Sequence, residues 1–305
     1  MVWIAKLTTL LNDIVKGKEE AVKMSVVTLV SGGHLLIEDV PGVGKTTLAL
    51  GLARATACSF NRIQFTSDLL PSDILGVNMY NPTEQNFQFK AGPIFANIVL
   101  ADEINRTNPK TQSALLEAMN EHRVSIDRET HLLPSPFMVI ATQNPLEYHG
   151  TFPLPESQMD RFMMHLHMGY PPFEQEKKAL MEMRPIEDLE KLTAIVTVEE
   201  IVRAREQVSG IFMDESLVEY ILQIVGATRK HEEVRLGVST RGARFMVQAS
   251  KGYAFLHGRD FVVPDDIQAV APFVIGHRIL LKRNHEIRHA RDLVGAIIRG
   301  IPRPV

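Results

Sequence analysis

Five short apolar runs lie in the first half of the chain, and most of them are continuously apolar rather than alternating with polar residues. Runs of this kind are typical of strands that helices cover on both faces. Helix-like segments such as Thr46–Ala57 and Pro109–Asn120 lie between them. This alternation predicts an α/β domain with a parallel sheet sandwiched by helices. The predicted strands are His34–Asp39, Arg62–Thr66, Asn97–Asp102, Phe137–Thr142 and Phe162–Met168.

After about residue 185 the pattern changes to a series of helix-like segments without a strong strand signal. Asp214 and Ser239 lie just before two of these segments, and we expect both to act as N-caps. The change predicts an α/β domain over residues 1–187 and an all-helical domain over residues 188–305. The predicted helices of the second domain are Val198–Gln207, Glu215–Thr228, Arg241–His257, Pro264–Leu281 and His289–Arg299.

Two stretches interrupt the pattern of the first domain. The segment 66–93 is polar and rich in turn residues. In the segment 123–136, Val124 and Ile126 alternate with polar residues before a polar turn, which predicts a β-hairpin. Insertions of this kind are often the places where α/β proteins contact partners.

Composition and charge narrow the class of protein. Of the 305 residues, 45% are hydrophobic and 23% are charged, as in an ordinary globular protein. The formal net charge of -3 gives no basic excess, so we expect no obligatory nucleic-acid partner. No run of about 18 apolar residues predicts insertion into a membrane. Cys58 is the single cysteine, so it cannot form an intrachain disulfide; it fits a reducing compartment, and we expect a cytoplasmic location.

The strongest chemical signal is a glycine-rich loop between a predicted strand and a predicted helix. Gly42 and Gly44 allow a tight bend in which successive N–H groups face phosphate oxygens. Lys45 would reach the β- and γ-phosphates of a nucleotide, and Thr46 would bind Mg²⁺. Asp39 replaces the usual first glycine, at a strand end where a side chain is tolerable. The loop reads Asp39, Val40, Pro41, Gly42, Val43, Gly44, Lys45, Thr46 and Thr47.

The second signal is a pair of carboxylates at the end of an apolar strand. Asp102 and Glu103 follow the run Ile98–Ala101. Asp102 would hold Mg²⁺, and Glu103 would polarise a water molecule for attack on the γ-phosphate. Because the glutamate is retained, the sequence favours ATP hydrolysis over nucleotide binding alone.

Three further polar residues are candidates with open alternatives. Asn144 follows a predicted strand and would position the attacking water, or it forms an Asn-Pro turn with Pro145. Arg161 precedes the fifth strand and is either an intramolecular salt-bridge former or an arginine finger for the nucleotide of a neighbouring subunit. Arg241 begins a helix of the second domain and either contacts the γ-phosphate or is a solvated helix-start arginine.

Together these residues resemble those of the AAA+ superfamily, and the sequences of the motifs resemble those of the MoxR family. The resemblance covers nearly the whole chain in the same order. The matching stretches are Ile14–Glu19, Glu38–Thr46, Ser67–Asp73, Leu100–Arg106, Ala141–Pro145, Leu154–Phe162, Val238–Gly242, Gly258–Asp260, Pro264–Asp266 and His277–Arg278.

The resemblance implies an AAA+ strand order followed by a helical lid. It places a helix-2 insert at about residues 66–93 and the hairpin before sensor 1 at about 123–136. It also implies the role of each motif residue. Walker A would contain Lys45 and Thr46, Walker B would contain Asp102 and Glu103, sensor 1 would be Asn144, the arginine finger would be Arg161, and sensor 2 would be Arg241.

The resemblance further implies that Val15 and the His277–Arg278 region border the adenine. ATP and Mg²⁺ would be the cofactors. Similar proteins are chaperone-like ATPases that mature or remodel protein clients, often beside von Willebrand factor A domain proteins. A homo-oligomeric ring, commonly hexameric, is expected because an arginine finger acts in trans.

Other functions are less consistent with the sequence. His285, Glu286 and His289 spell a zinc-protease motif, but Arg283 and Arg288 put positive charge around it. A GTPase would need a base-reading Asn-Lys-x-Asp motif, which the sequence lacks. A small-molecule kinase would not need the residues that favour hydrolysis. The main alternative is a nucleic-acid-associated AAA+ motor, against which the acidic charge balance counts.

Overall fold

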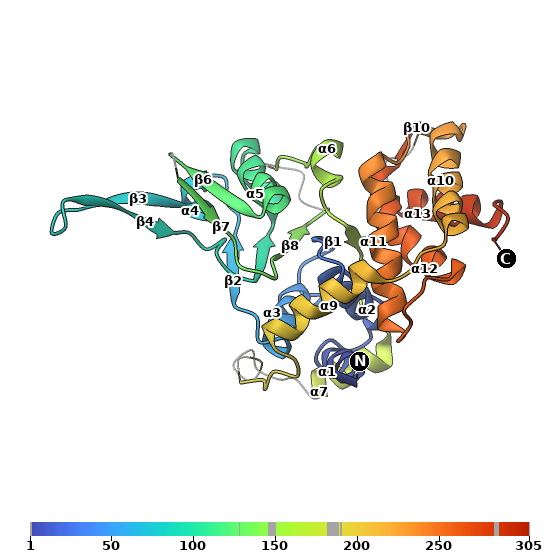
Figure 1. The fold of residues 1–305 in the computed structure, drawn as a ribbon, viewed down its shortest axis with the longest axis horizontal. Helices are drawn as coiled ribbons and strands as arrows, with labels where there is room; N and C mark the ends of the chain where they lie inside the picture. The colour runs from blue at the N-terminus through green and yellow to red at the C-terminus, as the bar shows by residue number, and fades with distance from the viewer. Residues whose placement is uncertain are drawn as a thin grey trace.

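The computed structural model contains an α/β part around a central sheet and a helical part that packs beside it (Figure 1). The predicted domain boundary between residues 187 and 188 lies outside the described residues. The structure describes residues 2–304 except 128, 146–150, 182–188, 190 and 284–286.

The central sheet has five parallel strands in the order β2-β5-β8-β1-β9. The parallel sheet predicted from continuous apolar runs is confirmed, and all five residues of β5 are buried. The strands are β1 (Leu35–Glu38), β2 (Phe60–Gln64), β5 (Ile98–Asp102), β8 (Met138–Gln143) and β9 (Met164–Leu166).

Helices cover both faces of this sheet. Successive strand residues point to opposite faces, so Leu35 and Ile37 belong to one hydrophobic cluster and Leu36 to the other. The first cluster joins the sheet to α1 (Val2–Ile14), α2 (Glu19–Val30), α3 (Lys45–Ala55) and the helical part. The second cluster packs α5 (Pro109–Glu121) onto the other face. Helix α2 is almost wholly buried between the sheet and the helical part, and the sequence pattern did not assign it.

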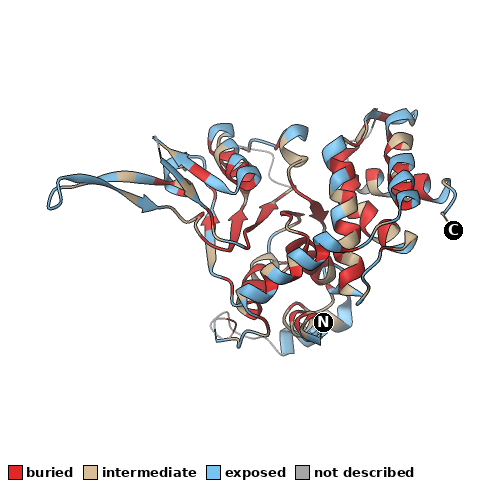
Figure 2. Cartoon of the chain, in the orientation of Figure 1, coloured by how far each residue is buried: buried red, intermediate tan, exposed pale blue. Residues whose placement is uncertain are grey.

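Two antiparallel hairpins extend the α/β part. The longer one is exposed along most of its length and projects from the body (Figures 1 and 2). The shorter one lies beside its base, where the Phe89 and His131 rings stack with centroids 3.8 Å apart. The elements are α4 (Pro71–Leu75), β3 (Gly76–Asn81), β4 (Asn86–Ala91), β6 (Arg123–Ile126) and β7 (Glu129–Leu132).

The helical part begins with α9 and ends with α13. Asp214 and Ser239 cap their helices as predicted, because their side chains accept hydrogen bonds from the amides of Ser216 and Gly242. No helix among the described residues is long and apolar enough to cross a membrane. The helices are α6 (Glu156–Met159) and α7 (Phe173–Met181) before this part, and α9 (Val198–Gly210), α10 (Glu215–Lys230), α11 (Thr240–Leu256), α12 (Pro264–Ile275) and α13 (Ile287–Arg299) within it.

The predicted helix over 264–281 differs from the structure at its C-terminal end. Helix α12 ends at Ile275, a 3₁₀ turn η2 covers Gly276–Arg278, and β11 (Leu280–Leu281) pairs with β10 (Val234–Leu236). Strands this short carry no periodic signal in the sequence. The turn directs Arg278 into a buried set of hydrogen bonds, and a continued helix would not have provided them.

Candidate functional site

The glycine-rich loop connects β1 to α3. Gly42 and Gly44 have φ angles of 86° and 93°, a left-handed conformation that glycine adopts without steric strain. The loop therefore reverses tightly and ends at the first turn of α3. The ammonium of Lys45 folds back over the loop, where Nζ donates to the main-chain oxygens of Asp39 and Val40 at 2.7 and 3.1 Å.

Asp39 anchors the base of this loop and does not line the cavity beside it. Its buried carboxylate accepts hydrogen bonds from the amides of Val40 at 3.0 Å and Gly169 at 2.6 Å. Lys18 donates to the carbonyl of Gly169 at 2.6 Å from the other side. An aspartate at this position thus ties the loop to the segment after β9, which a glycine could not do.

The end of β1 is joined to the helical part through buried polar groups. Although burial raises the pKa of Glu38, the hydrogen bond from His165 brings it below the ordinary value. Burial lowers the pKa of His165 itself, so its neutral ring donates from Nε2 to Glu38 at 3.0 Å. Its Nδ1 lies 3.1 Å from Nη2 of Arg291 on α13. The strand before the loop is therefore linked to the last helix through His165 on β9.

The carboxylates of Asp102 and Glu103 lie beside the loop at the end of β5. Thr142 on β8 holds both residues, since its hydroxyl donates to Asp102 Oδ1 at 2.6 Å and accepts from the Glu103 amide at 2.8 Å. The Glu103 carboxylate accepts from Gln64 at 2.7 Å and from Arg106 at 2.8 Å. Both carboxylates therefore have defined positions.

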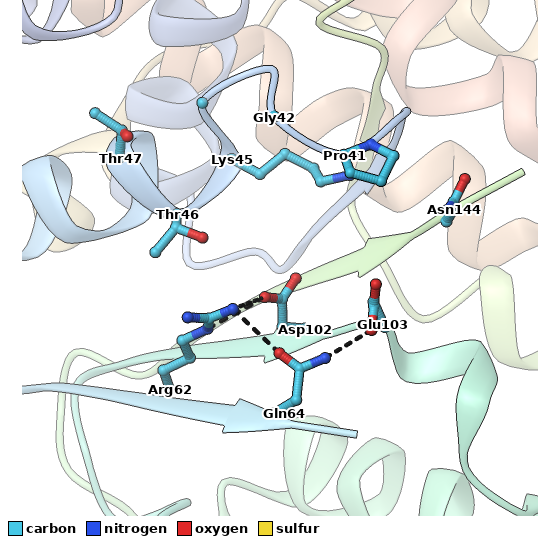
Figure 3. A pocket seen from close by; sticks show the side chains of 11 residues that line it. Pro41, Gly42, Lys45, Thr46, Thr47, Arg62, Gln64, Asp102, Glu103 and Asn144 are labelled. Carbon is cyan, nitrogen blue, oxygen red and sulfur yellow. Dashed lines mark hydrogen bonds and ion pairs between the residues drawn. The ribbon is translucent and has the colours of Figure 1, made fainter. Parts of the chain in front are cut away.

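A cavity of about 340 Å³ brings most of the predicted residues together (Figure 3). Arg62 and Gln64 on β2 also point into it, and the sequence reasoning missed both. A signal for them was present in the sequence, because both are polar residues within the run 62–66, which was predicted to be a buried strand. The lining residues are Pro41, Gly42, Gly44, Lys45, Thr46, Thr47, Arg62, Gln64, Asp102, Glu103 and Asn144.

The donor set of this cavity fits a magnesium–nucleotide complex. The Thr46 hydroxyl and the Asp102 carboxylate are oxygen ligands of the kind that Mg²⁺ prefers. The Arg62 guanidinium already lies against Asp102 Oδ2, so the carboxylate accommodates a cation at this place. The loop amides and Lys45 provide positive potential for phosphate oxygens.

Arg161 and Arg241 do not line this cavity. Arg161 donates from Nη1 to the carbonyl of Leu116 on α5 at 3.1 Å and lines a separate cavity of about 350 Å³. Within the described part of the chain, its buried Nε atom has no hydrogen-bond partner. Arg241 is the second residue of α11, and its Nη1 lies 3.5 Å from Asp160 Oδ2.

The residues expected to border the adenine have different surroundings. Val15 is buried beside the loop, with its Cγ1 3.6 Å from the place of a Cβ on Gly44. Val43 is also buried. His277 and Arg278 are buried and bond to the carbonyl of Phe162. Burial and the charge of Arg278 lower the pKa of His277 well below its ordinary value. Their predicted contact with adenine remains a prediction.

The first two residues of the zinc-protease motif, His285 and Glu286, lie outside the described residues. Among the residues that are described, no group of three or more His, Cys, Asp or Glu side chains could hold a metal ion.

Comparison with known proteins agrees with this geometry. Residues 34–164 match the ATPase family associated with various cellular activities (AAA), and residues 226–297 match an AAA lid domain. Chaperone MoxR1 of Mycobacterium tuberculosis is 41% identical over 277 residues, which cover 88% of this chain and 73% of that protein. The chain belongs to the MoxR family of AAA+ ATPases.

Similarity to two further proteins extends over nearly the full length of the chain. Protein YeaC of Bacillus subtilis is 46% identical over 99% of this chain and 95% of its own length. A crystal structure from Cytophaga hutchinsonii, of a protein assigned as an ATPase, superposes with a TM-score of 0.90 at 37% identity and covers 100% of this chain and 96% of its own. The AAA+ strand order and the helical lid implied by the MoxR resemblance are therefore confirmed.

Proposed function

We propose that this MoxR-family chain hydrolyses ATP in a Mg²⁺-dependent reaction and uses the energy to remodel or mature a protein client. The observation that carries the proposal is the position of Glu103, which lines one cavity with Lys45 and Thr46. A carboxylate beside a phosphate loop serves as the base that hydrolysis needs.

The proposal assigns roles to the residues that face the phosphates and the attacking water. The loop amides and Lys45 bind the β- and γ-phosphates, while Glu103 takes the proton of the attacking water. Gln64 and Arg106 hold the Glu103 carboxylate, and Asn144 orients the water. Mg²⁺, held by Thr46 and Asp102, would neutralise charge on the phosphate oxygens when bound.

We also propose that the chain works as a homo-oligomeric ring, taken as a hexamer. Arg161 lies outside the cavity of its own subunit, which supports a role as a finger toward the nucleotide of the next subunit. Arg241 would act as sensor 2 from the lid. The name of the mycobacterial relative supports a chaperone-like role toward a protein client, such as a von Willebrand factor A domain protein. The cytoplasmic location remains part of the same proposal.

The test is steady-state ATP hydrolysis measured against protein concentration, with mass determined by light scattering and with or without DNA. We expect the specific ATPase activity to rise as rings assemble and to be the same with and without DNA. Strong stimulation by DNA would favour the nucleic-acid motor. Turnover by a monomer that is independent of concentration would contradict the ring, and absence of turnover at every concentration would contradict hydrolysis.

A further inference from the structure

Asp160 is the point at which the α/β part meets three groups of the lid. It lies between α6 and β9, directly before Arg161. Its Oδ1 accepts from Arg278 Nε at 2.7 Å, and both carboxylate oxygens lie 3.0 Å from the hydroxyl of Ser239. Arg241 Nη1 lies 3.5 Å from Oδ2. One carboxylate therefore connects η2 and the start of α11 to the segment that carries Arg161.

The contact with Arg278 is the most deeply buried of the three. The Arg278 side chain is 1% exposed, and its Nη1 donates to the carbonyls of Met163 and Val274. A buried guanidinium without its carboxylate would be strongly unfavourable. Ser239 adds to this anchor, because its hydroxyl also caps α11 through the amide of Gly242.

The same Arg278 binds the main chain on both sides of Arg161. Its Nη2 donates to the carbonyl of Asp160 at 3.0 Å and to the carbonyl of Phe162 at 2.5 Å. The backbone of Arg161 is therefore held between two carbonyls that a lid residue fixes. A displacement of η2 would displace the base of the Arg161 side chain.

The contact with Arg241 is the loose one. The Arg241 side chain is 44% exposed, and its Nη1 lies 3.5 Å from Asp160 Oδ2. Exposed ion pairs of this kind contribute little to the stability of a fold. A cation in the first turn also opposes the helix dipole, so helix stability does not explain the arginine at this position. Among the three lid groups at Asp160, Arg241 is therefore the one that can leave while Ser239 and Arg278 remain bound.

We propose that Asp160 is a positioning residue through which nucleotide occupancy, sensed by Arg241 in one subunit, sets the placement of Arg161 toward the next subunit. The inference rests on the proposed ATPase function in a ring. It predicts that an ATP-filled subunit and an empty subunit present Arg161 differently, and that the difference depends on Asp160.

Mixed rings test this directly. Wild-type subunits are combined with an excess of Glu103→Gln partners, designed to bind ATP without hydrolysing it, or of Lys45→Ala partners, designed to stay empty. Turnover per wild-type subunit is measured in both, with ring mass followed by light scattering. We expect the two partners to change turnover by different factors, about five-fold apart or more, as is typical of coupled sites.

Asp160→Asn is then introduced into the two partners only. We then expect the ratio of turnover per wild-type subunit between the two mixtures to fall to about one, which is the value without coupling. Glu156→Gln in the same partners is the matched control, because the Glu156 carboxylate also pairs with a lid residue, Arg235, at 4.0 Å, while only its main chain contacts the flank of Arg161, through the amide of Asp160. This control should leave the ratio unchanged.

The inference is overturned if Asp160→Asn leaves the ratio of turnover between the two mixtures unchanged. It is also overturned if that ratio is already one before any change at Asp160. In both cases turnover by wild-type rings would still support the ATPase function. Failure of that function would instead appear as wild-type rings without turnover. If Asp160→Asn partners do not enter rings, Ser239→Ala removes one hydrogen bond of the anchor and should lower the ratio. An unchanged ratio with rings intact would count against the proposal.

Discussion

The guanidinium of Arg62 donates two hydrogen bonds to one oxygen of Asp102, with Nη2 2.5 Å and Nε 3.1 Å from Oδ2 (Figure 3). The two residues lie on the neighbouring strands β2 and β5, where Arg62 pairs in register with Leu100. A positive charge thus lies at the carboxylate proposed to hold Mg²⁺. Arg62 therefore competes with a metal ion for this carboxylate.

Arg62→Met is expected to lower the Mg²⁺ concentration for half-maximal ATP hydrolysis by roughly two- to five-fold, the scale of a partly exposed ion pair. The reason is that the competing cation is removed while the length of the side chain is kept. Arg123→Met is the control, because Arg123 pairs with Glu121 outside the cavity. A higher Mg²⁺ requirement, or a raised KM for ATP, would mean that Arg62 is a phosphate ligand instead.

Glu103→Gln should bind ATP and hydrolyse it slowly. The amide keeps the shape of the side chain but cannot take a proton, and loss of a general base reduces turnover by roughly 10²- to 10⁴-fold. Binding of a fluorescent ATP analogue and single-turnover hydrolysis are the two measurements. Turnover near that of the wild type would remove Glu103 from the proposed mechanism.

Arg161→Ala should keep ATP binding but lose turnover that depends on assembly, by roughly 10³-fold or more as for other arginine fingers. The side chain lies outside the cavity of its own subunit, so binding within one subunit does not need it. Turnover of both proteins is compared over a dilution series. Equal specific activity of variant and wild type across that series would exclude a finger in trans.

His34 should make the fold less stable in acid. Burial lowers its pKa from 6.5 to about 3, although the hydrogen bond to the carbonyl of Met119 at 3.0 Å acts in the opposite direction. The ring also accepts a hydrogen bond from the amide of Val139 at 2.9 Å. The unfolded chain therefore binds the proton more readily. Stability from neutral His34 is fully present above pH 6.5 and is lost as pH falls toward the folded pKa of about 3.

The measurement for His34 is urea unfolding as a function of pH. The expected slope from this residue is up to about 1.4 kcal/mol per pH unit below its unfolded pKa. His34→Gln offers an acceptor and a donor without titrating, so the dependence should become shallower. An unchanged dependence in that variant would show that other groups cause the acid sensitivity.

Two helical glycines test the packing of the helical part on α2. At Gly252 in α11, a Cβ would lie 2.0 Å from Ser31 Oγ and 3.3 Å from Val27 Cγ1. Gly252→Ala should therefore destabilise by about 1–3 kcal/mol through overpacking. Gly226→Ala in α10 is the matched control, since nothing lies within 4 Å of its Cβ position, and it should stabilise by about 0.5–1 kcal/mol. The measurement is the free energy of unfolding of each variant in urea. Equal stability of the two variants would contradict the close contact between α11 and α2.

Several parts of the fold could be predicted because their signals are local. The continuous apolar runs gave the five strands, and Asp214 and Ser239 were recognised as caps from their place before periodic segments. Helix α2 was missed because it is buried on nearly all sides and therefore lacks a clear polar face. The β10–β11 pair was missed because strands of two and three residues have no measurable period.

By itself, the sequence determined the chemistry that depends on neighbouring residues: the left-handed glycines of the loop, the lysine at the start of α3, and two carboxylates at the end of β5. Only the tertiary structure decided which side chains meet them. The Arg62–Asp102 and Gln64–Glu103 contacts join residues 40 and 39 positions apart, and Asp160–Arg278 joins residues 118 apart. Periodicity records which face of an element is buried, whereas these contacts depend on strand order and on how the lid packs, which no local pattern contains.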